Sequence, residues 1–281
     1  MSNPPQLPTS PKVDYHTHTR FSGDSQEPME NQVKAAVDRG LTQIAFTEHE
    51  DYNPDDSTSF FFRHEDYLGE MARLREQYGD RITLRAAIEI SEPHRHPERA
   101  AAVLARYPWD FVLGSLHWLT PWINTFEPAF FTYRGANTWR ESFRDYFVEL
   151  GQLAKHGDFD VLAHIDYPSR YGLKFFAEDY DIGEYESEIR AVLRTLIERG
   201  KGTEINTSIL RRGRKDPNPP QVVINWYREM GGEILTVGSD SHAAKDTGSH
   251  LDVALGMART AGFTHIATFE NRQPTLVPIG A

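Results

Sequence analysis

Short apolar runs alternate along the chain with longer segments whose apolar residues recur at helical spacing. The short runs predict β-strands near residues 13–15, 44–46, 82–88, 111–113, 161–163, 203–205, 234–237 and 265–269. The longer segments predict α-helices at residues 29–39, 65–78, 97–107, 138–155, 185–199, 220–230 and 251–260. Glycines follow several of these helices, where a left-handed residue commonly ends a helix. Regular alternation of strands and helices is typical of a parallel sheet.

Seven or eight such repeats, with no shift in composition between them, predict a single-domain α/β fold. A closed (β/α) barrel is favoured over an open sheet, and chains of this length commonly form one barrel. We expect the barrel to span residues 12–281. A disordered tail is expected at residues 1–11, which are rich in proline and polar residues and lack the apolar run of a signal peptide. Two aromatic-rich loops, near residues 53–62 and 120–133, are expected either to form lids or simply to pack on the barrel.

Composition and charge narrow the classes of function. A net charge of −11 disfavours nucleic acid and anionic membranes as partners, because both would repel most of the surface. A small phosphorylated substrate is compatible with this charge if local cations outweigh it. The absence of cysteine excludes disulfides, thiolate metal ligands and a cysteine nucleophile. No stretch approaches the roughly 20 apolar residues of a membrane span, so we predict a cytoplasmic protein.

Histidines and carboxylates gather directly after the predicted strands. The histidines are His16, His18, His49, His117, His164 and His242, and the carboxylates are Asp24, Glu48, Glu89, Asp166, Glu204 and Asp240. Because the carboxyl ends of barrel strands open on one face, these side chains are expected to converge there. Imidazole and carboxylate ligands without thiolate suit Zn, Mn or Fe. The set contains more ligands than one ion takes, which indicates several ions.

Each of these residues also has a structural explanation when taken alone. His16 and His18 lie on the same face of a strand and can reach one ion, although an isolated His-x-His pair is a weak signal. Asp24 alone is typical of a turn, and the Ser-Asp-Ser-His sequence at residues 239–242 of a capping turn. Glu89 ends an apolar strand, where a carboxylate is costly to bury without a cation. The shared position at strand ends, rather than any single residue, predicts the metal site.

The ordered set of motifs resembles the PHP (polymerase and histidinol phosphatase) family. The motifs are residues 16–18 (HTH), 47–49 (TEH), Glu89, 114–117 (GSLH), 163–166 (AHID) and 238–242 (GSDSH). Residues 14–18 (DYHTH), 21–24 (FSGD), 164–172 (HIDYPSRYG) and 204–208 (EINTS) are similar to the histidinol-phosphatase branch of that family. The similarity runs from about Lys12 to Arg272, which is nearly the whole chain.

The resemblance implies a distorted, TIM-like (β/α)7 barrel with about three divalent metal ions. One ion would take His16, His18, Glu89 and Asp240. A second would share Glu89 and take His117 and His164. The third would take Asp24, His49 and His242.

The implied activity is hydrolysis of a small phosphate monoester by a metal-bridging hydroxide. In this branch the reaction is L-histidinol phosphate to L-histidinol and phosphate, in histidine biosynthesis. We expect Arg170 to bind the phosphate, since guanidinium matches phosphate bidentately. Arg211 and Ser115 are further predicted substrate contacts. Asp166 is expected to protonate the leaving oxygen or to orient a ligand histidine, and helix capping explains it equally well.

Three alternatives remain open at the level of the sequence. A phosphoesterase of the same family could act on another substrate, such as a nucleotide, a sugar phosphate or a nucleic-acid end. An amidohydrolase-like metal hydrolase also uses His-x-His and a late aspartate, but usually has a metal-bridging lysine, and no predicted strand here ends in one. A non-catalytic metal-binding module is disfavoured because none of the expected ligands is missing.

Overall fold

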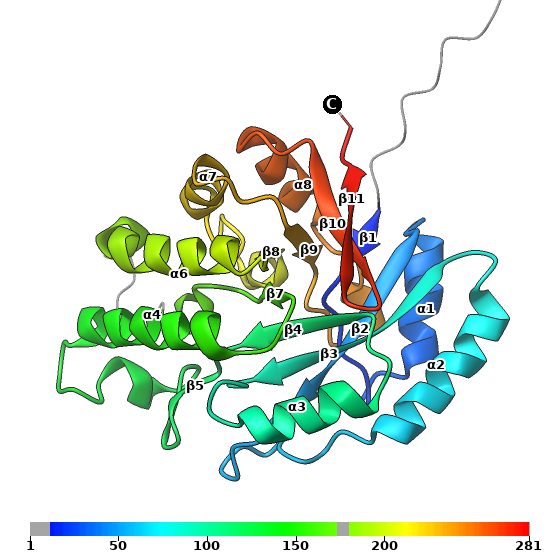
Figure 1. The fold of residues 1–281 in the computed structure, drawn as a ribbon, viewed down its shortest axis with the longest axis horizontal. Coiled ribbons are helices and arrows are strands. Elements are labelled where there is room, and N and C mark those ends of the chain that lie inside the picture. The colour runs from blue at the N-terminus through cyan, green and yellow to red at the C-terminus, as the bar shows by residue number, and fades with distance from the viewer. Residues whose placement is uncertain (1–11, 173–179, 281) are drawn as a thin grey trace, which may run out of the picture.

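A seven-stranded parallel sheet forms the centre of the fold (Figure 1). The computed structural model describes residues 12–172 and 180–280, so the tail predicted at residues 1–11 lies outside the described residues. In pairing order the strands are β1 (Val13–Asp14), β2 (Gln43–Glu50), β3 (Thr83–Ser91), β4 (Phe111–Ser115), β7 (Val161–Leu162), β8 (Gly202–Asn206) and β9 (Leu235–Gly238). Each neighbouring pair is parallel.

Backbone hydrogen bonds at the carboxyl-terminal ends of β1 and β9 bring the two edges of this sheet together. The Tyr15 N–H donates to the carbonyl oxygen of Val237 at 2.9 Å, and the Asp240 N–H donates to that of His16 at 2.7 Å. The sheet is thereby curled into a nearly closed barrel. The predicted single-domain (β/α)7 architecture is confirmed.

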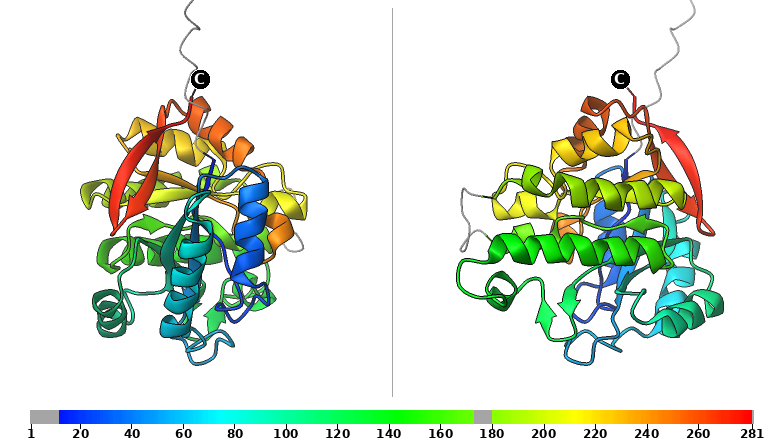
Figure 2. Two further views of the ribbon diagram at one scale, coloured as in Figure 1. Left: turned by 90° about the vertical axis from the view of Figure 1, so that its right-hand side faces the viewer. Right: turned by 60° about the vertical axis from the view of Figure 1, so that its left-hand side comes forward.

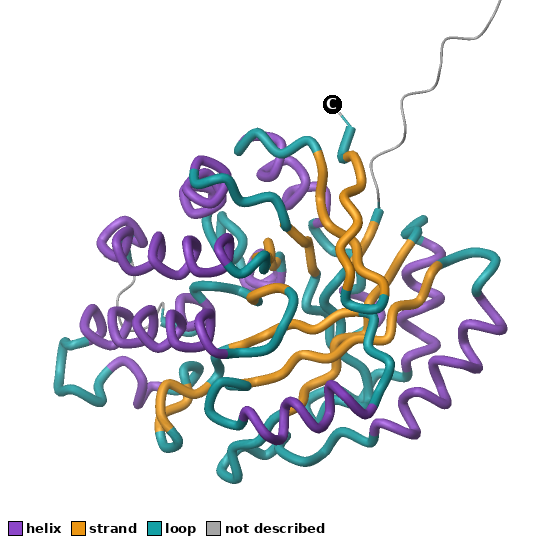
Figure 3. The backbone as a smooth tube through the Cα atoms, viewed as in Figure 1, coloured by secondary structure: helices purple, strands orange, loops and turns teal. Residues whose placement is uncertain are grey.

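Helices surround the barrel on its outside (Figure 3). They are α1 (Met29–Asp38), α2 (His64–Tyr78), α3 (Pro97–Arg106), α4 (Trp139–His156), α6 (Glu186–Glu198), α7 (Gln221–Glu229) and α8 (Leu251–Thr260). Each predicted helix is present. In α4 the buried Phe143, Phe147, Leu150 and Leu153 recur at spacings of three and four residues, which places them on one face toward the core. Helices α4 and α6 run side by side, as Figure 2 shows.

The eighth predicted strand forms but does not join the barrel. Strand β10 (His265–Glu270) instead pairs antiparallel with β11 (Gln273–Pro278), which the sequence pattern did not predict. The turn residues Asn271 and Arg272 have φ values of 50° and 62°, as a two-residue hairpin turn with left-handed residues requires. Arg272 lies 3.0 Å from Asp160, directly before β7. The hairpin therefore packs at the amino-terminal end of the barrel strands.

The remaining elements of the described residues are short. They are β5 (Trp118–Thr120), β6 (Ile123–Asn124) and the 3-10 helices η1 (Pro128–Phe131), η2 (Tyr167–Arg170), η3 (Ile182–Tyr185), η4 (Ser208–Arg212) and η5 (Ala244–Asp246). In the aromatic loop of residues 120–133, Phe130 and Phe131 are buried, and the Phe130 ring lies 5.7 Å from that of Phe143 on α4. This part of the loop is packed into the core. No helix in the described residues is long and apolar enough to cross a bilayer.

Candidate metal centre

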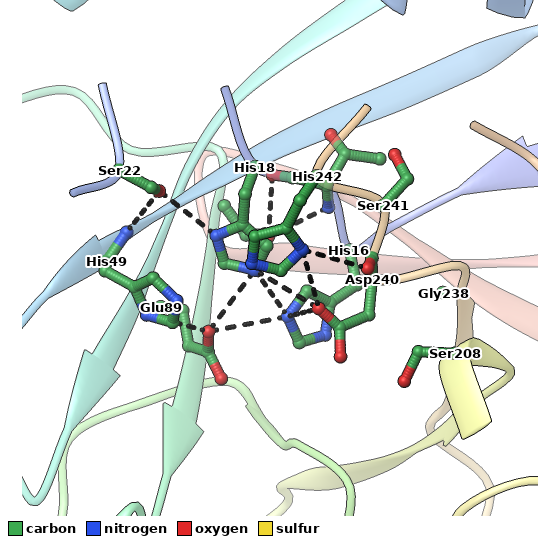
Figure 4. Close-up of polar contacts among 12 residues, drawn as sticks. His16, His18, Ser22, His49, Glu89, Ser208, Gly238, Asp240, Ser241 and His242 are labelled. Atoms are coloured by element: carbon green, nitrogen blue, oxygen red, sulfur yellow. Dashed lines mark hydrogen bonds and ion pairs between the residues drawn. The ribbon is translucent and has the colours of Figure 1, made fainter. Parts of the chain in front are cut away.

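The predicted metal ligands meet at the carboxyl-terminal end of the barrel strands, around a cavity of about 330 Å³. Those that line the cavity are Asp24, His49, Glu89, His117, His164, Asp240 and His242. His16 and His18 are fully buried, with their Nε2 atoms 3.0 Å apart. Figure 4 shows side chains from several strands pointing toward a common centre. The convergence expected from strand-end positions is therefore present.

Glu89 occupies the middle of this cluster, at the end of β3. Its Oε1 lies 3.0 Å from Nε2 of His164 and 3.6 Å from Nε2 of His117. Its Oε2 faces the other side and lies 3.4 Å from Nε2 of His16 and 3.5 Å from Nε2 of His18. This buried Oε2 accepts no hydrogen bond from any residue that the structure describes. A buried carboxylate oxygen without a donor is costly, and cations between Glu89 and the histidines would remove that cost.

Asp24 marks the outer part of the cluster and is the most exposed of the predicted ligands. Its Oδ2 lies 2.8 Å from Nε2 of His242 and 3.5 Å from Nε2 of His49. The second nitrogen of His49, Nδ1, lies 3.2 Å from Oε2 of Glu89. His49 thus connects the outer pair to the central carboxylate.

Within the described part of the chain, four groups of three side chains bring possible ligand atoms within 4.8 Å of one another. They are His18 with His49 and His242, His16 with Glu89 and His164, His16 with His18 and Asp240, and His49 with Asp51 and His117. Donors that are all imidazole or carboxylate suit a divalent transition metal. The cluster is a site for divalent metal ions, and Asp51 enters one of its groups although the sequence analysis did not propose it.

The charges in the cluster favour binding of cations. Burial alone would raise the pKa of Glu89 and Asp240, but neighbouring cations outweigh burial and hold both pKa values well below the usual range. His16 acts on both carboxyls, and Arg170 also acts on Asp240. Burial and the neighbouring imidazoles lower the pKa of His18. Burial opposes protonation of His16 and His49 too, but nearby carboxylates outweigh it and raise both pKa values, so a bound metal ion would displace protons from these two imidazoles. Ionised carboxylate and neutral imidazole are the forms that coordinate metals.

Two of the predicted ligands have strained backbones. His164 lies two residues after the end of β7 and has a φ of 22°. Asp240 lies two residues after the end of β9 and has a φ of 51°. Non-glycine residues in this region cost free energy and tend to cluster at functional sites. With the backbone in this left-handed turn, the Asp240 side chain points into the cluster, and its Oδ1 lies 3.6 Å from Nε2 of His18.

Carboxylates outside the cluster orient its histidines. Oε1 of Glu204 lies 2.8 Å from Nδ1 of His16, and Oε2 of Glu204 accepts the His164 backbone N–H at 3.2 Å. A Cβ at Gly238 would approach both Glu204 Oε1 and His16 Cβ to 2.4 Å, so glycine permits this close packing. Glu204 is one of the carboxylates expected at strand ends, and its contact with Nδ1 holds His16 in place.

Serine hydroxyls connect two further histidines to buried carboxylates. Ser22 Oγ lies 3.1 Å from Nδ1 of His18 and donates to Glu48 at 2.6 Å. Ser91 Oγ lies 2.9 Å from Nδ1 of His117 and donates to Asp51. Such outer contacts fix the tautomer and the ring orientation of a ligand histidine. Neither serine was identified from the sequence, because a serine near a strand end carries no distinctive signal by itself.

Asp166 does not face the metal cavity, which corrects its predicted roles. It is 1% exposed, and it accepts hydrogen bonds from Asn218 Nδ2 at 2.8 Å and from Ser169 Oγ at 3.0 Å. It lines a separate cavity of about 460 Å³. The strained backbone of His164 turns the chain into η2, so a residue two positions later points elsewhere. Asp166 therefore neither reaches a leaving group in the metal cavity nor contacts a ligand histidine.

Ser115, predicted to contact substrate, is also placed away from the cavity. It is fully buried at the end of β4. Its hydroxyl lies 3.3 Å from that of Ser91 and 3.4 Å from the carbonyl oxygen of Ile90. These neighbours make Ser115 a packing residue behind His117.

Three arginines line the metal cavity. Arg170 is largely buried, its guanidinium lies 4.4 Å from the Tyr167 ring centroid, and its Nε has no partner in the described chain. Arg211 donates to the carbonyl oxygen of Ser239 at 2.7 Å. Arg212 lies over an aromatic ring of the cavity wall. Guanidinium groups match the geometry of phosphate oxygens, so this side of the cavity suits a phosphoryl group.

The fold and the site together define a metal-binding (β/α) barrel. The family profile of the PHP domain matches residues 14–208, and the chain belongs to the PHP family. It is 29% identical to a histidinol-phosphatase of Lactococcus lactis, over 92% of this chain and 94% of that protein. It is 32% identical to a probable histidinol-phosphatase of Clostridium acetobutylicum, over 92% and 97%.

A solved structure is similar over nearly the whole barrel. It is the histidinol phosphate phosphatase of Lactococcus lactis in complex with zinc, L-histidinol and phosphate. The TM-score is 0.85 with 27% sequence identity, and the similarity covers 94% of this chain and 98% of that one.

Proposed function

We propose that this protein is a metal-dependent phosphatase that hydrolyses L-histidinol phosphate to L-histidinol and phosphate. The observation that carries the proposal is Glu89, whose two oxygens face different histidine pairs in a cavity that Arg170 also lines. A site that hydrolyses a phosphate monoester needs cations that bind the phosphoryl group and a pocket that holds the alcohol. The two relatives named above, which match over more than 90% of this chain, carry histidinol-phosphatase names.

The proposed cofactor is a set of three divalent ions, of Zn, Mn or Fe. We assign His16, His18, Glu89 and Asp240 to the first, Glu89, His117 and His164 to the second, and Asp24, His49 and His242 to the third. Oε2 of Glu89 faces the first set and Oε1 faces the second, and the group of His16, His18 and Asp240 falls within the first set. The other three groups join side chains of different sets, so the assignment of each ligand to one ion rests on the family resemblance. Zinc is favoured among the three metals by the zinc-containing relative.

Bound divalent ions would supply Lewis acidity toward the phosphoryl oxygens and would lower the pKa of a nearby water. The protein's own part is to bind and orient the ester. Arg170 lines the cavity and would hold a phosphoryl oxygen through its guanidinium group, while its Nη1 donates to Asp240 Oδ2 at 3.1 Å. Arg211 would add positive charge, although it already donates to the carbonyl oxygens of Ser239 and Asp240.

Phosphate release from a panel of esters tests this function. The panel contains L-histidinol phosphate, a nucleoside monophosphate and a sugar phosphate, and each is assayed with the metal content of the same sample. We expect fastest release from L-histidinol phosphate, loss of release after chelation, and about three ions per chain by elemental analysis. Faster release of phosphate from another ester would support the phosphatase activity and assign a different substrate. One ion or none after reconstitution would overturn the three-ion centre.

A further inference from the structure

A side chamber of about 220 Å³ adjoins the metal cavity. The two share a rim formed by Asp24, His49, His117, Tyr167 and Tyr171. A molecule whose phosphoryl group lies in the metal cavity can therefore extend its other end across this rim.

The two chambers differ in charge. Among the described residues, three arginines line the metal cavity beyond the shared rim, whereas those that line only the side chamber include no arginine or lysine. The latter are Asp51, Asp56, Ser57, Thr58 and Phe126. An anionic group is thus favoured on one side of the rim and a cationic group on the other.

Asp56 is the carboxylate best placed to meet such a cation. It is half-buried, and Trp118 Nε1 donates to its Oδ2 at 2.7 Å. Thr58 donates to its Oδ1 from the backbone N–H at 2.9 Å and from the hydroxyl at 2.7 Å. A carboxylate has about four lone-pair sites, so one more donor can be accepted on a group that is already fixed in position. Asp51 is 4% exposed, its Oδ1 accepts the Ser91 hydroxyl, and its Oδ2 competes with Asp56 Oδ1 for the single hydroxyl hydrogen of Thr58.

Aromatic rings form the wall of the chamber near Asp56. The ring centroids of Phe126 and Tyr171 lie 6.0 Å apart, and those of Tyr167 and Tyr171 lie 5.5 Å apart. Such rings attract cations through their faces and pack against planar heterocycles. The chamber therefore combines a fixed negative charge with flat apolar surfaces.

We propose that the side chamber binds the cationic alcohol part of the substrate, and that Asp56 and Phe126 determine specificity for it. L-Histidinol carries an ammonium group and an imidazole ring, and these match the carboxylate and the aromatic wall. Asp56 accepts a hydrogen bond from the cation, and Phe126 packs against the ring. This inference rests on the proposed function, because the bound phosphoryl group places the alcohol at the rim.

Two measurements on Asp56→Asn test the assignment. The first is calorimetric binding of L-histidinol, which needs no turnover. The second is kcat/KM for L-histidinol phosphate and for glycerol phosphate, whose alcohol is uncharged. Loss of a hydrogen bond between charged groups predicts about ten- to a hundredfold weaker L-histidinol binding and a similar loss in kcat/KM for its ester. The loss of kcat/KM for glycerol phosphate should be much smaller, because its alcohol offers no cation to Asp56. Phe126→Ala should also lose more kcat/KM for L-histidinol phosphate than for glycerol phosphate, and this loss should be smaller than in Asp56→Asn.

Asp55→Asn is the matched control, because Asp55 is an exposed neighbour on the same loop that lines neither chamber. Metal content is measured for every variant. Equal losses for both esters, unchanged L-histidinol binding in Asp56→Asn, or no L-histidinol binding by the unmodified protein would overturn the assignment. Binding that depends on Asp56 without any release of phosphate from the ester would overturn the proposed function and leave the binding site standing.

Discussion

His16 Nδ1 lies 2.8 Å from Glu204 Oε1, and both side chains are completely buried. An ionised carboxylate can only accept, so Nδ1 of His16 carries the hydrogen and Nε2 is left to face Glu89. Glu204 also accepts the backbone N–H of His164 at 3.2 Å. One residue outside the cluster therefore positions two segments that carry proposed ligands.

Glu204→Gln should weaken metal retention while the barrel stays folded. Glutamine keeps the size of the side chain but replaces one acceptor with an amide donor, and loss of an outer partner typically costs about ten- to a hundredfold in metal affinity. The measurement is bound metal across a series of chelator concentrations. Glu198→Gln, at the exposed end of α6, is the control and should behave as the unmodified protein does. A chelator midpoint unchanged in Glu204→Gln would show that this contact does not position a ligand.

Much of this site was predictable because parallel strands end on the same side of a barrel. That rule alone brings His16, His49 and Glu89 together from distant parts of the sequence. It predicts where a side chain starts but not where it points. Glu48 and Glu204 lie near strand ends as Glu89 does, yet Glu204 pairs with the far nitrogen of His16 and Glu48 accepts from the Ser22 hydroxyl.

Local backbone conformation accounts for the errors. Asp166 follows the strained His164, and the turn there carries it into a different cavity. The strand at β10 has the apolar pattern of a barrel strand, but its partner is β11, whose residues are largely exposed. Pairing of that kind depends on the turn at Asn271, which hydrophobic periodicity does not encode.

Glu89→Gln should reduce activity and bound metal far more than Asp24→Asn. Each oxygen of Glu89 faces a different histidine pair, so its neutralisation leaves two proposed ions close together with less negative charge between them. Among the described residues, the ion-pair partners of Asp24 are His242 and His49, at the exposed side of the cluster. The comparison uses kcat and metal content measured on the same preparations. Small and equal losses in both variants would show that Glu89 does not bridge two ions.

Glu92 should make stability fall as pH rises. Burial raises the pKa of Glu92 from 4.5 to about 8. Between these values the folded state holds a proton that the unfolded state has released, so the free energy of unfolding decreases with increasing pH. Glu92→Gln should flatten this dependence between pH 4.5 and 8. Tm is measured across this range on metal-free protein, with the exposed Glu98→Gln as control. If the slope of Tm against pH is unchanged in Glu92→Gln, other groups cause the pH dependence of stability.

Arg170→Ala should raise KM for L-histidinol phosphate more than it lowers kcat. A guanidinium that holds the phosphoryl group throughout the reaction stabilises substrate and transition state alike, and removing it affects binding. A hydrogen bond between charged groups is worth about 1.5–3 kcal/mol, or roughly ten- to a hundredfold in kcat/KM. If the contact strengthens as charge develops, kcat falls as well.

Arg170 also donates to Asp240 Oδ2 at 3.1 Å, so its removal can disturb a proposed metal ligand. Metal content measured beside the kinetics separates the two effects, because lost phosphate binding leaves the metal in place. Arg170→Lys keeps the positive charge without the bidentate geometry, and it should recover part of the affinity. Arg194→Ala, on the outside of α6, is the control and should leave both constants unchanged. A kcat/KM that stays constant in Arg170→Ala with full metal content would remove Arg170 from the substrate site.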